Sequence, residues 1–321
     1  MVTSSRNIKI NEREEIKIDV PWGHLSGIWY GSKLNKPLLA LHGWQDNAST
    51  FDTLTPLLPS NVSVLAIEFP GHGFSSPIPA GMCYRSVDFI FTIKFVMNAY
   101  KWKTIALIGH SLGSQVAFYF AALFPEKVEF LILLDAFQTK LNLINNSIDI
   151  MRFQAEKFWT LYLKNDSHKE PPSYTYEECV DKLHEGTYKS VTKDCAKYLL
   201  NRNLKKSELF PNKYYFIRDG RLKYNEMFNY SEDVGKEMAR RITSPFLLLK
   251  AHDEGTSYHE EKKFIYGAVE LLRKSNSDFS FNIVSGTHHV HLCEPEKVAK
   301  IVNPFLDKYY SRYSQWIKNK L

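Results

Sequence analysis

Residues 104–125 read TIALIGHSLGSQVAFYFAALFP, an apolar run, a glycine-bounded turn and a second apolar run closed by proline. The first run is short and rich in large apolar side chains, which predicts a buried strand over 104–108. The second predicts a helix over 112–124 that ends before the proline. Ser111 stands at the apex of the turn, so we expect a strained elbow that lifts its hydroxyl above the sheet.

Short apolar runs on both sides of this stretch predict a mostly parallel sheet. The first two runs alternate and sit close together, which predicts an antiparallel hairpin at the sheet edge. Helical patterns over 84–100 and 112–124 fall between later runs, and this alternation predicts right-handed crossovers and a doubly wound sheet. The predicted strands cover residues 15–20, 25–30, 37–41, 62–67, 104–108, 128–134, 245–249 and 279–284.

A long interval separates the strands predicted to end at 134 and to begin at 245. A crossover between parallel strands needs only about 10–12 residues or somewhat more, so the excess must have structure of its own. Its apolar residues recur with helical spacing. We therefore expect a core domain of residues 1–135 and 245–321 around an inserted helical cap, or lid, of residues 136–244.

The composition is that of a globular protein. The hydrophobic fraction is 44% and the charged fraction 24%, close to the averages of about 45–50% and 25%, which excludes a disordered, collagen-like or coiled-coil chain. The net charge is +6, but the basic residues are dispersed in pairs, so we expect no nucleic-acid partner. No stretch approaches the roughly 20 apolar residues of a membrane span. The four cysteines lie far apart, which argues against a disulfide framework.

The ends of the chain carry two expectations about localisation. The first residues lack the apolar run of a secretory signal, so we expect a cytoplasmic protein. The last three residues, Asn319-Lys-Leu321, are similar to a peroxisomal address except at the first position. Peroxisomal import is therefore the alternative. The sequence does not indicate an oligomeric state.

A serine hydroxyl needs a positioned base before it becomes a good nucleophile. In a strand–elbow–helix architecture the acid and then the histidine follow the serine along the chain. His288 is the first histidine after the last predicted strand and the Gly286 turn, so we expect it to be the base. His289 stays open as an alternative base, while packing or capping is the expected role of His289 and His291.

Three carboxylates could orient this base from the carboxyl edge of the sheet. Asp253 follows the strand predicted over 245–249 and is the preferred acid. Glu254 is adjacent and could substitute for it. Asp135 ends the strand predicted over 128–134 and also stays open, although a helix cap at the start of the insertion is its other interpretation.

Acyl transfer builds negative charge on a carbonyl oxygen, and two backbone N–H groups usually stabilise it. One predicted donor is Leu112, the residue after the nucleophile. The other is Trp44, in the loop after the strand predicted over 37–41, where Gly43 allows close approach of the backbone. The three histidines at 288, 289 and 291 could suggest a metal, but no second histidine–carboxylate cluster with a recognised metal spacing accompanies them. We therefore expect neither a metal nor a cofactor.

These motifs resemble those of the α/β-hydrolase superfamily over nearly the whole chain. Three segments also resemble the Kraken-like, or serine-hydrolase-like, group within this superfamily: residues 42–47, 216–222 and 288–291. The resemblance implies the α/β-hydrolase fold and a Ser-acid-His hydrolase. Glu68 stands where relatives commonly have aspartate, and we expect it to be structural. The superfamily motifs are His42-Gly-Trp44, Glu68–Ser75, Gly109–Gly113 and His288–Pro295.

Together these patterns predict a cofactor-free serine hydrolase of the carboxylesterase type. Its expected substrate is a small ester or thioester with an apolar moiety, cleaved through an acyl-enzyme by Ser111, His288 and Asp253. Hydrolysis of amide or carbon–carbon bonds on the same scaffold is one alternative, since fold does not determine substrate. A ligand-binding protein with low turnover is another. Cap aromatics such as Phe153 and Trp159 could line an apolar pocket or pack within the cap.

Overall fold

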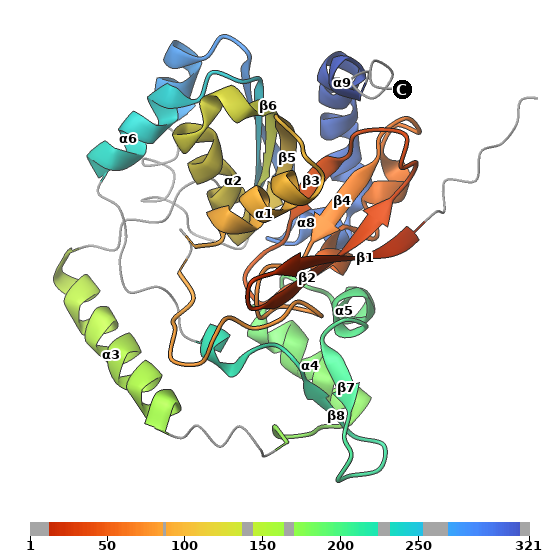
Figure 1. Ribbon diagram of the computed structural model, residues 1–321, viewed down its shortest axis with the longest axis vertical. Helices are drawn as coiled ribbons and strands as arrows, with labels where there is room; N and C mark the ends of the chain where they lie inside the picture. The colour runs from red at the N-terminus through yellow and green to blue at the C-terminus, as the bar shows by residue number, and fades with distance from the viewer. Residues whose placement is uncertain are drawn as a thin grey trace, which may run out of the picture.

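The computed structural model describes residues 13–85, 88–136, 144–163, 170–223, 232–252 and 269–314. An eight-stranded sheet forms its centre, in the order β1-β2-β4-β3-β5-β6-β9-β10, with helices on both faces (Figure 1). The strands are β1 (Arg13–Val20), β2 (Gly23–Tyr30), β3 (Leu38–Leu41), β4 (Val64–Ile67), β5 (Ile105–His110), β6 (Val128–Leu134), β9 (Phe246–His252) and β10 (Phe279–Ser285).

The pairing of the strands confirms the predicted doubly wound sheet. The β1–β2 hairpin and the β2–β4 pair are antiparallel, and the other neighbouring strands of this sheet are parallel. Every predicted strand overlaps an observed one. The largest extension is at the end of β9, which continues to His252 because β10 pairs alongside it as far as Ser285.

The sheet is buried on both faces, as expected for parallel strands covered by crossover helices. Along β3, Leu39 and Leu41 join the core under α1, α2 and α6, whereas Leu38 and Ala40 join the core under α9. This alternation is the two-residue period of a strand. The helices of these two layers are α1 (Ile90–Ala99), α2 (Leu112–Leu123), α6 (Glu232–Arg241), α8 (Val290–Cys293) and α9 (Pro295–Ser314).

One expected helix differs in extent from the observed one. The helix predicted over 84–100 begins only at Ile90, because Tyr84 belongs to a loop in which its hydroxyl donates to Asp219 Oδ2 at 2.9 Å. The segment after Asn47 forms two short 3-10 turns, η1 (Ala48–Phe51) and η2 (Thr55–Leu57), with the Asn47 side chain accepting from Ser49 N. Two further 3-10 turns are η3 (Pro125–Lys127) and η4 (Gly220–Lys223).

The long insertion contains helices, as its periodicity predicted. It also contains a small hairpin, which the sequence did not predict. Its described elements up to residue 223 include α3 (Ile144–Leu163), α4 (Tyr176–Gly186), α5 (Lys193–Leu200), β7 (Leu204–Lys206) and β8 (Tyr214–Phe216). Figure 1 shows α4, α5 and the β7–β8 hairpin grouped at one end of the molecule. They share a small core around Cys179, Leu199 and Leu200. By contrast, α6 packs against α2, so the later part of the range predicted as cap lies on the core.

A buried ion pair joins the insertion to the sheet domain. The Arg202 guanidinium, which follows α5, donates to both carboxylate oxygens of Glu68 at 2.7 and 3.1 Å. It also reaches Glu15 on β1 at 2.6 Å. Glu68 accepts from the backbone N–H groups of Ala48 and Phe74 as well. These contacts agree with the structural role expected for Glu68.

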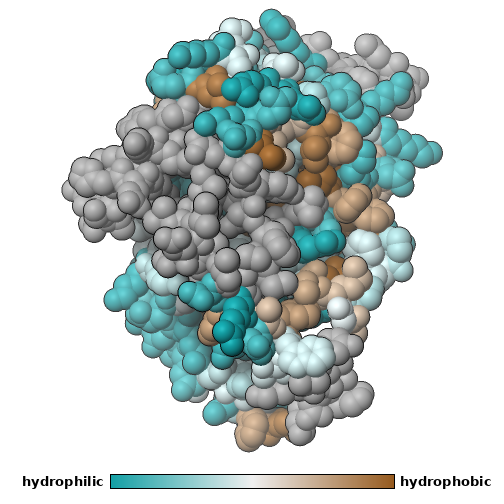
Figure 2. All heavy atoms as spheres, turned by 90° about the vertical axis from the view of Figure 1, so that its left-hand side faces the viewer, coloured by the Kyte–Doolittle hydropathy of each residue, from teal (hydrophilic) through white to brown (hydrophobic). Residues whose placement is uncertain are grey.

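Figure 2 shows one face of the molecule, coloured by hydropathy. Hydrophilic and hydrophobic residues are interspersed over the described part of the face in Figure 2. Among the described helices, none is long and apolar enough to cross a bilayer. All four cysteines are free thiols, as the sequence predicted. On α3 the side chains of Phe153 and Trp159 are more than half exposed.

Candidate active site

The elbow between β5 and α2 has the strained geometry that the sequence predicted. Ser111 has φ 51° and ψ −115°, in a region that non-glycine residues rarely adopt. Its N–H donates to Leu134 O at 3.1 Å, which fixes the turn against β6. A Cβ at Gly109 would lie 2.4 Å from Gly113 O, and one at Gly113 would lie 2.0 Å from Leu41 O. The two glycines are therefore required by close packing around the serine.

His288 and Asp135 meet at the carboxyl edge of the sheet. His288 follows β10 and Gly286, which has φ +145° and leaves no room for a side chain beside Val290. The His288 Nδ1 shares a short hydrogen bond with Asp135 Oδ2. Because a carboxylate only accepts, Nδ1 carries the proton and Nε2 is left as the basic nitrogen.

The Asp135 carboxylate is held by more than the histidine. Its Oδ1 accepts from Ala251 N at 2.8 Å and pairs with Lys250 Nζ at 2.8 Å. Its own N–H donates to Leu249 O at 2.7 Å, and its φ is 60°. Burial alone would raise the pKa of Asp135, but the hydrogen bond from His288 and the charge of Lys250 outweigh it and lower the pKa. The group is therefore ionised at neutral pH.

The preferred sequence candidate for the acid, Asp253, and its neighbour Glu254 lie outside the described residues. The residue that contacts His288 is Asp135, which the sequence left open between an acid and a helix cap. Both β6 and β9 end at the same edge of the sheet, so either strand could present an acid there. Asp135 directly follows the strand predicted over 128–134, whereas Asp253 comes four residues after the strand predicted over 245–249, and this difference was the signal for Asp135 in the sequence.

The elbow and the histidine loop are joined by a backbone contact. His110 Nε2 donates to the carbonyl oxygen of His288 at 3.0 Å, and the two rings are 4.7 Å apart. The residue before Ser111, the expected nucleophile, is therefore hydrogen-bonded to the expected base. Among the described residues, no hydrogen bond joins Ser111 Oγ to His288 Nε2. Catalytic hydrogen bonds are often long or poorly aligned in enzymes without bound substrate.

The two predicted oxyanion donors lie at the start of a helix and in a loop. Leu112 is the first residue of α2, and the first N–H groups of a helix have no partner within it. Trp44 lies in the loop after β3, where its indole Nε1 donates to Leu222 O at 2.9 Å. Gln45 Nε2 donates to the same oxygen at 2.8 Å. The loop that carries the second donor is thus bound to η4 of the insertion.

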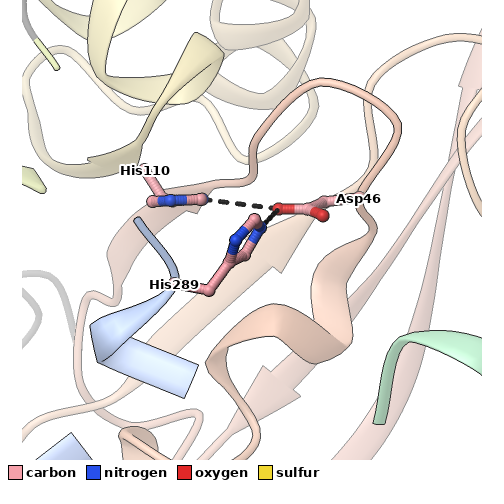
Figure 3. Close-up of side chains that lie close together, drawn as sticks. All are labelled: Asp46, His110 and His289. Atoms are coloured by element: carbon pink, nitrogen blue, oxygen red, sulfur yellow. Dashed lines mark ion pairs between the residues drawn. The ribbon is translucent and has the colours of Figure 1, made fainter. Parts of the chain in front are cut away.

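A buried cluster of Asp46, His110 and His289 lies beneath these loops (Figure 3). Asp46 Oδ2 is 3.4 Å from His110 Nδ1 and 3.3 Å from His289 Nε2. Burial lowers the pKa of His110 to about 4, despite the nearby Asp46 carboxylate. Burial would raise the pKa of Asp46, but the two histidines lower it well below its usual value. The cluster connects the loop after β3, the end of β5 and the histidine loop.

The other histidines of the loop have packing roles, as expected. His289 is buried, and its Nδ1 contacts Ser190 Oγ at 2.8 Å while its Nε2 faces Asp46. His291 is fully buried, with its Nε2 2.9 Å from Thr50 Oγ1. Of the described residues, the atoms of Asp46, His110 and His289 are the group that could hold a metal ion. The expectation that the protein uses no metal stays a prediction.

Comparisons with known proteins show the family and the fold of this chain. Residues 36–219 match the family model of the α/β hydrolase fold. A serine hydrolase-like protein from Mus musculus is 35% identical over 306 residues, which cover 91% of this chain and 95% of the relative. The crystal structure of a hypothetical protein from Pseudomonas aeruginosa has a TM-score of 0.78 at 26% identity, covering 92% of this chain and 99% of the other. A thioesterase domain from the curacin biosynthetic pathway, at 18% identity and a TM-score of 0.72, shares the fold over 91% of this chain and 99% of its own.

Proposed function

Since the chain belongs to the α/β-hydrolase family, we propose that it is a serine hydrolase that cleaves a carboxylic ester or thioester through Ser111, His288 and Asp135. The observation that carries this proposal is the hydrogen bond between His288 Nδ1 and a buried, ionised Asp135. An acid in this position fixes the tautomer of the histidine and stabilises the imidazolium that forms during catalysis.

The reaction follows from the atoms that each residue presents. Ser111 Oγ attacks the carbonyl carbon while His288 Nε2 takes the hydroxyl proton. The negative charge that develops on the carbonyl oxygen is stabilised by the N–H groups of Leu112 and Trp44. The carbonyl re-forms, the bond to the leaving group breaks, and His288 returns the proton to the departing alcohol or thiol. An acyl group then remains on Ser111.

Water then hydrolyses the acyl-enzyme, and His288 again acts first as a base and then as an acid. His288 Nε2 takes a proton from water, and the resulting hydroxide attacks the acyl carbonyl. The acid product leaves as the proton returns to Ser111 Oγ. Asp135 stays ionised throughout and orients the ring. No step needs a redox group, which supports the expectation of a cofactor-free enzyme.

A fluorophosphonate probe tests the proposal directly, because such probes label activated serines. The protein should be labelled at Ser111 and should hydrolyse 4-nitrophenyl butyrate. Ser111→Ala should abolish labelling and lower turnover by roughly a million-fold. The control is Ser207→Ala, which removes a serine directly after β7. It should change neither labelling nor turnover. Failure of the folded protein to be labelled would favour a binding protein with low turnover.

A further inference from the structure

A cavity of about 490 Å³ lies between the oxyanion loop and the inserted segment. The Trp44–Asp46 segment forms one wall, and residues from α4, the segment after it and η4 form the others. The cavity therefore touches the loop that carries the proposed second oxyanion donor. The lining includes Trp44, Lys182, Phe216, Arg218, Asp219 and Lys223.

Arg218 is the unusual member of this lining. Its guanidinium lies over the Phe216 ring, with Cζ 4.9 Å from the ring centre, and its Nε is buried without a hydrogen-bond partner. No carboxylate in the described part of the chain forms an ion pair with it. Burial lowers the pKa of this guanidinium from its usual value, although an arginine stays charged at neutral pH. The guanidinium is partly exposed and pairs with no described carboxylate, so it is available to an anionic ligand.

The remaining charges of the cavity strengthen its positive character. Lys182 and Lys223 line it, and neither is ion-paired with a described carboxylate. The two acids of the lining are already engaged. Asp46 faces the imidazoles of His110 and His289, whereas Asp219 pairs with Arg221 at 2.6 Å and accepts from a tyrosine hydroxyl. Lys182 Nζ lies 4.2 Å from the centre of the Tyr174 ring, and no described carboxylate pairs with Arg218, Lys182 or Lys223.

We propose that this cavity binds an anionic group, a carboxylate or a phosphate, carried by the substrate, with Arg218 as its principal partner. A planar guanidinium suits both groups because it can donate two parallel hydrogen bonds. The apolar sides of Trp44 and Phe216 accommodate the chain that carries the anion. This inference rests on the proposed function and narrows its substrate class from an apolar ester to an acyl compound with a remote negative charge.

Three substrates and three variants test the inference. The substrates are neutral 4-nitrophenyl butyrate, 4-nitrophenyl hemiglutarate with an acyl-side carboxylate, and butyryl-coenzyme A with phosphates on the leaving group. Arg218→Gln should raise KM for at least one anionic substrate by about tenfold to a hundredfold and leave the butyrate nearly unchanged. The substrate affected identifies the anion as a carboxylate or a phosphate. Lys182→Gln should have the same selectivity with a smaller effect.

The matched control is Lys206→Gln, which removes an exposed cation from the hairpin outside the cavity. It should leave all three KM values unchanged. The inference is overturned if Arg218→Gln lowers activity on the three substrates equally, since that result indicates a structural role. It is also overturned if Arg218→Gln changes none of them.

A binding measurement separates this inference from the proposed chemistry. In the Ser111→Ala protein, glutarate or coenzyme A should raise the melting temperature, and Arg218→Gln should abolish that rise. If no ester is hydrolysed but the Arg218-dependent rise is found, the proposed function fails and the anion site stands. A rise that persists in Arg218→Gln, or the absence of any rise, rejects the site.

Discussion

Asp135 and His288 are 153 residues apart in the chain, yet their side chains share a short hydrogen bond at one edge of the sheet. Asp135 directly follows β6, and His288 lies in the loop after β10, two strands away in the sheet. The parallel strands place both carboxyl ends at the same edge. The pair is therefore a product of topology rather than of local sequence.

Removing the charge of Asp135 should impair catalysis without unfolding the protein. Asp135→Asn keeps the shape of the side chain but favours the wrong tautomer of His288, so kcat should fall roughly 10⁴-fold. Steady-state hydrolysis of 4-nitrophenyl butyrate measures this loss. Asp253→Asn is the matched control and should retain turnover. The opposite ranking of the two variants would restore Asp253 as the acid.

The lowered pKa of Asp135 predicts a pH-dependent contribution to stability. A carboxyl whose folded pKa lies below its unfolded value of 3.8 stabilises the fold at higher pH. That contribution is lost as the pH falls through the folded pKa. The difference in unfolding free energy between wild type and Asp135→Asn should therefore be larger at about pH 6 than at about pH 3. Urea unfolding at the two pH values measures it, and a constant difference would contradict the prediction.

The buried Arg202–Glu68 pair should contribute to stability far more than a surface pair. Arg202→Met keeps most of the apolar stem but leaves the Glu68 carboxylate buried without its partner, which should cost about 3–5 kcal/mol. Arg240→Met breaks an exposed pair with Glu237 and should cost less than about 1 kcal/mol. Urea unfolding compares the two. Equal costs would show that Arg202 does not anchor the insertion energetically.

The close approach of α2 to β3 predicts a strong effect of a single methyl group. The Cβ of Gly113→Ala would meet the Leu41 carbonyl oxygen at 2.0 Å, so backbone must shift and stability should fall by about 1–3 kcal/mol. Gly186→Ala, at the end of α4, has nothing within 4 Å of the new Cβ. It should be neutral or stabilise by up to about 1 kcal/mol. Thermal unfolding measures both, and a harmless Gly113→Ala would refute the packing argument.

Local sequence patterns were sufficient for most of the fold. Buried strands are short apolar runs and the elbow needs glycine on both sides of Ser111, so periodicity and turn chemistry identified them. The β7–β8 hairpin was not predicted, because each of its strands has only three residues and a strand of this length shows no recognisable period. The start of α1 was placed too early because a tertiary contact, Tyr84 with Asp219, holds the preceding segment as a loop.

The sequence by itself determined the sheet and the serine elbow, because each depends on residues that are neighbours in the chain. It also indicated His288 as the base, which stays a prediction. Only the tertiary structure decided which carboxylate meets His288 and which cations line the cavity. Asp135 is brought to the histidine by strand order, and Asp219 pairs with Arg221, so that no described carboxylate pairs with Arg218. Such pairings depend on distances between segments far apart in the chain, which no local pattern encodes.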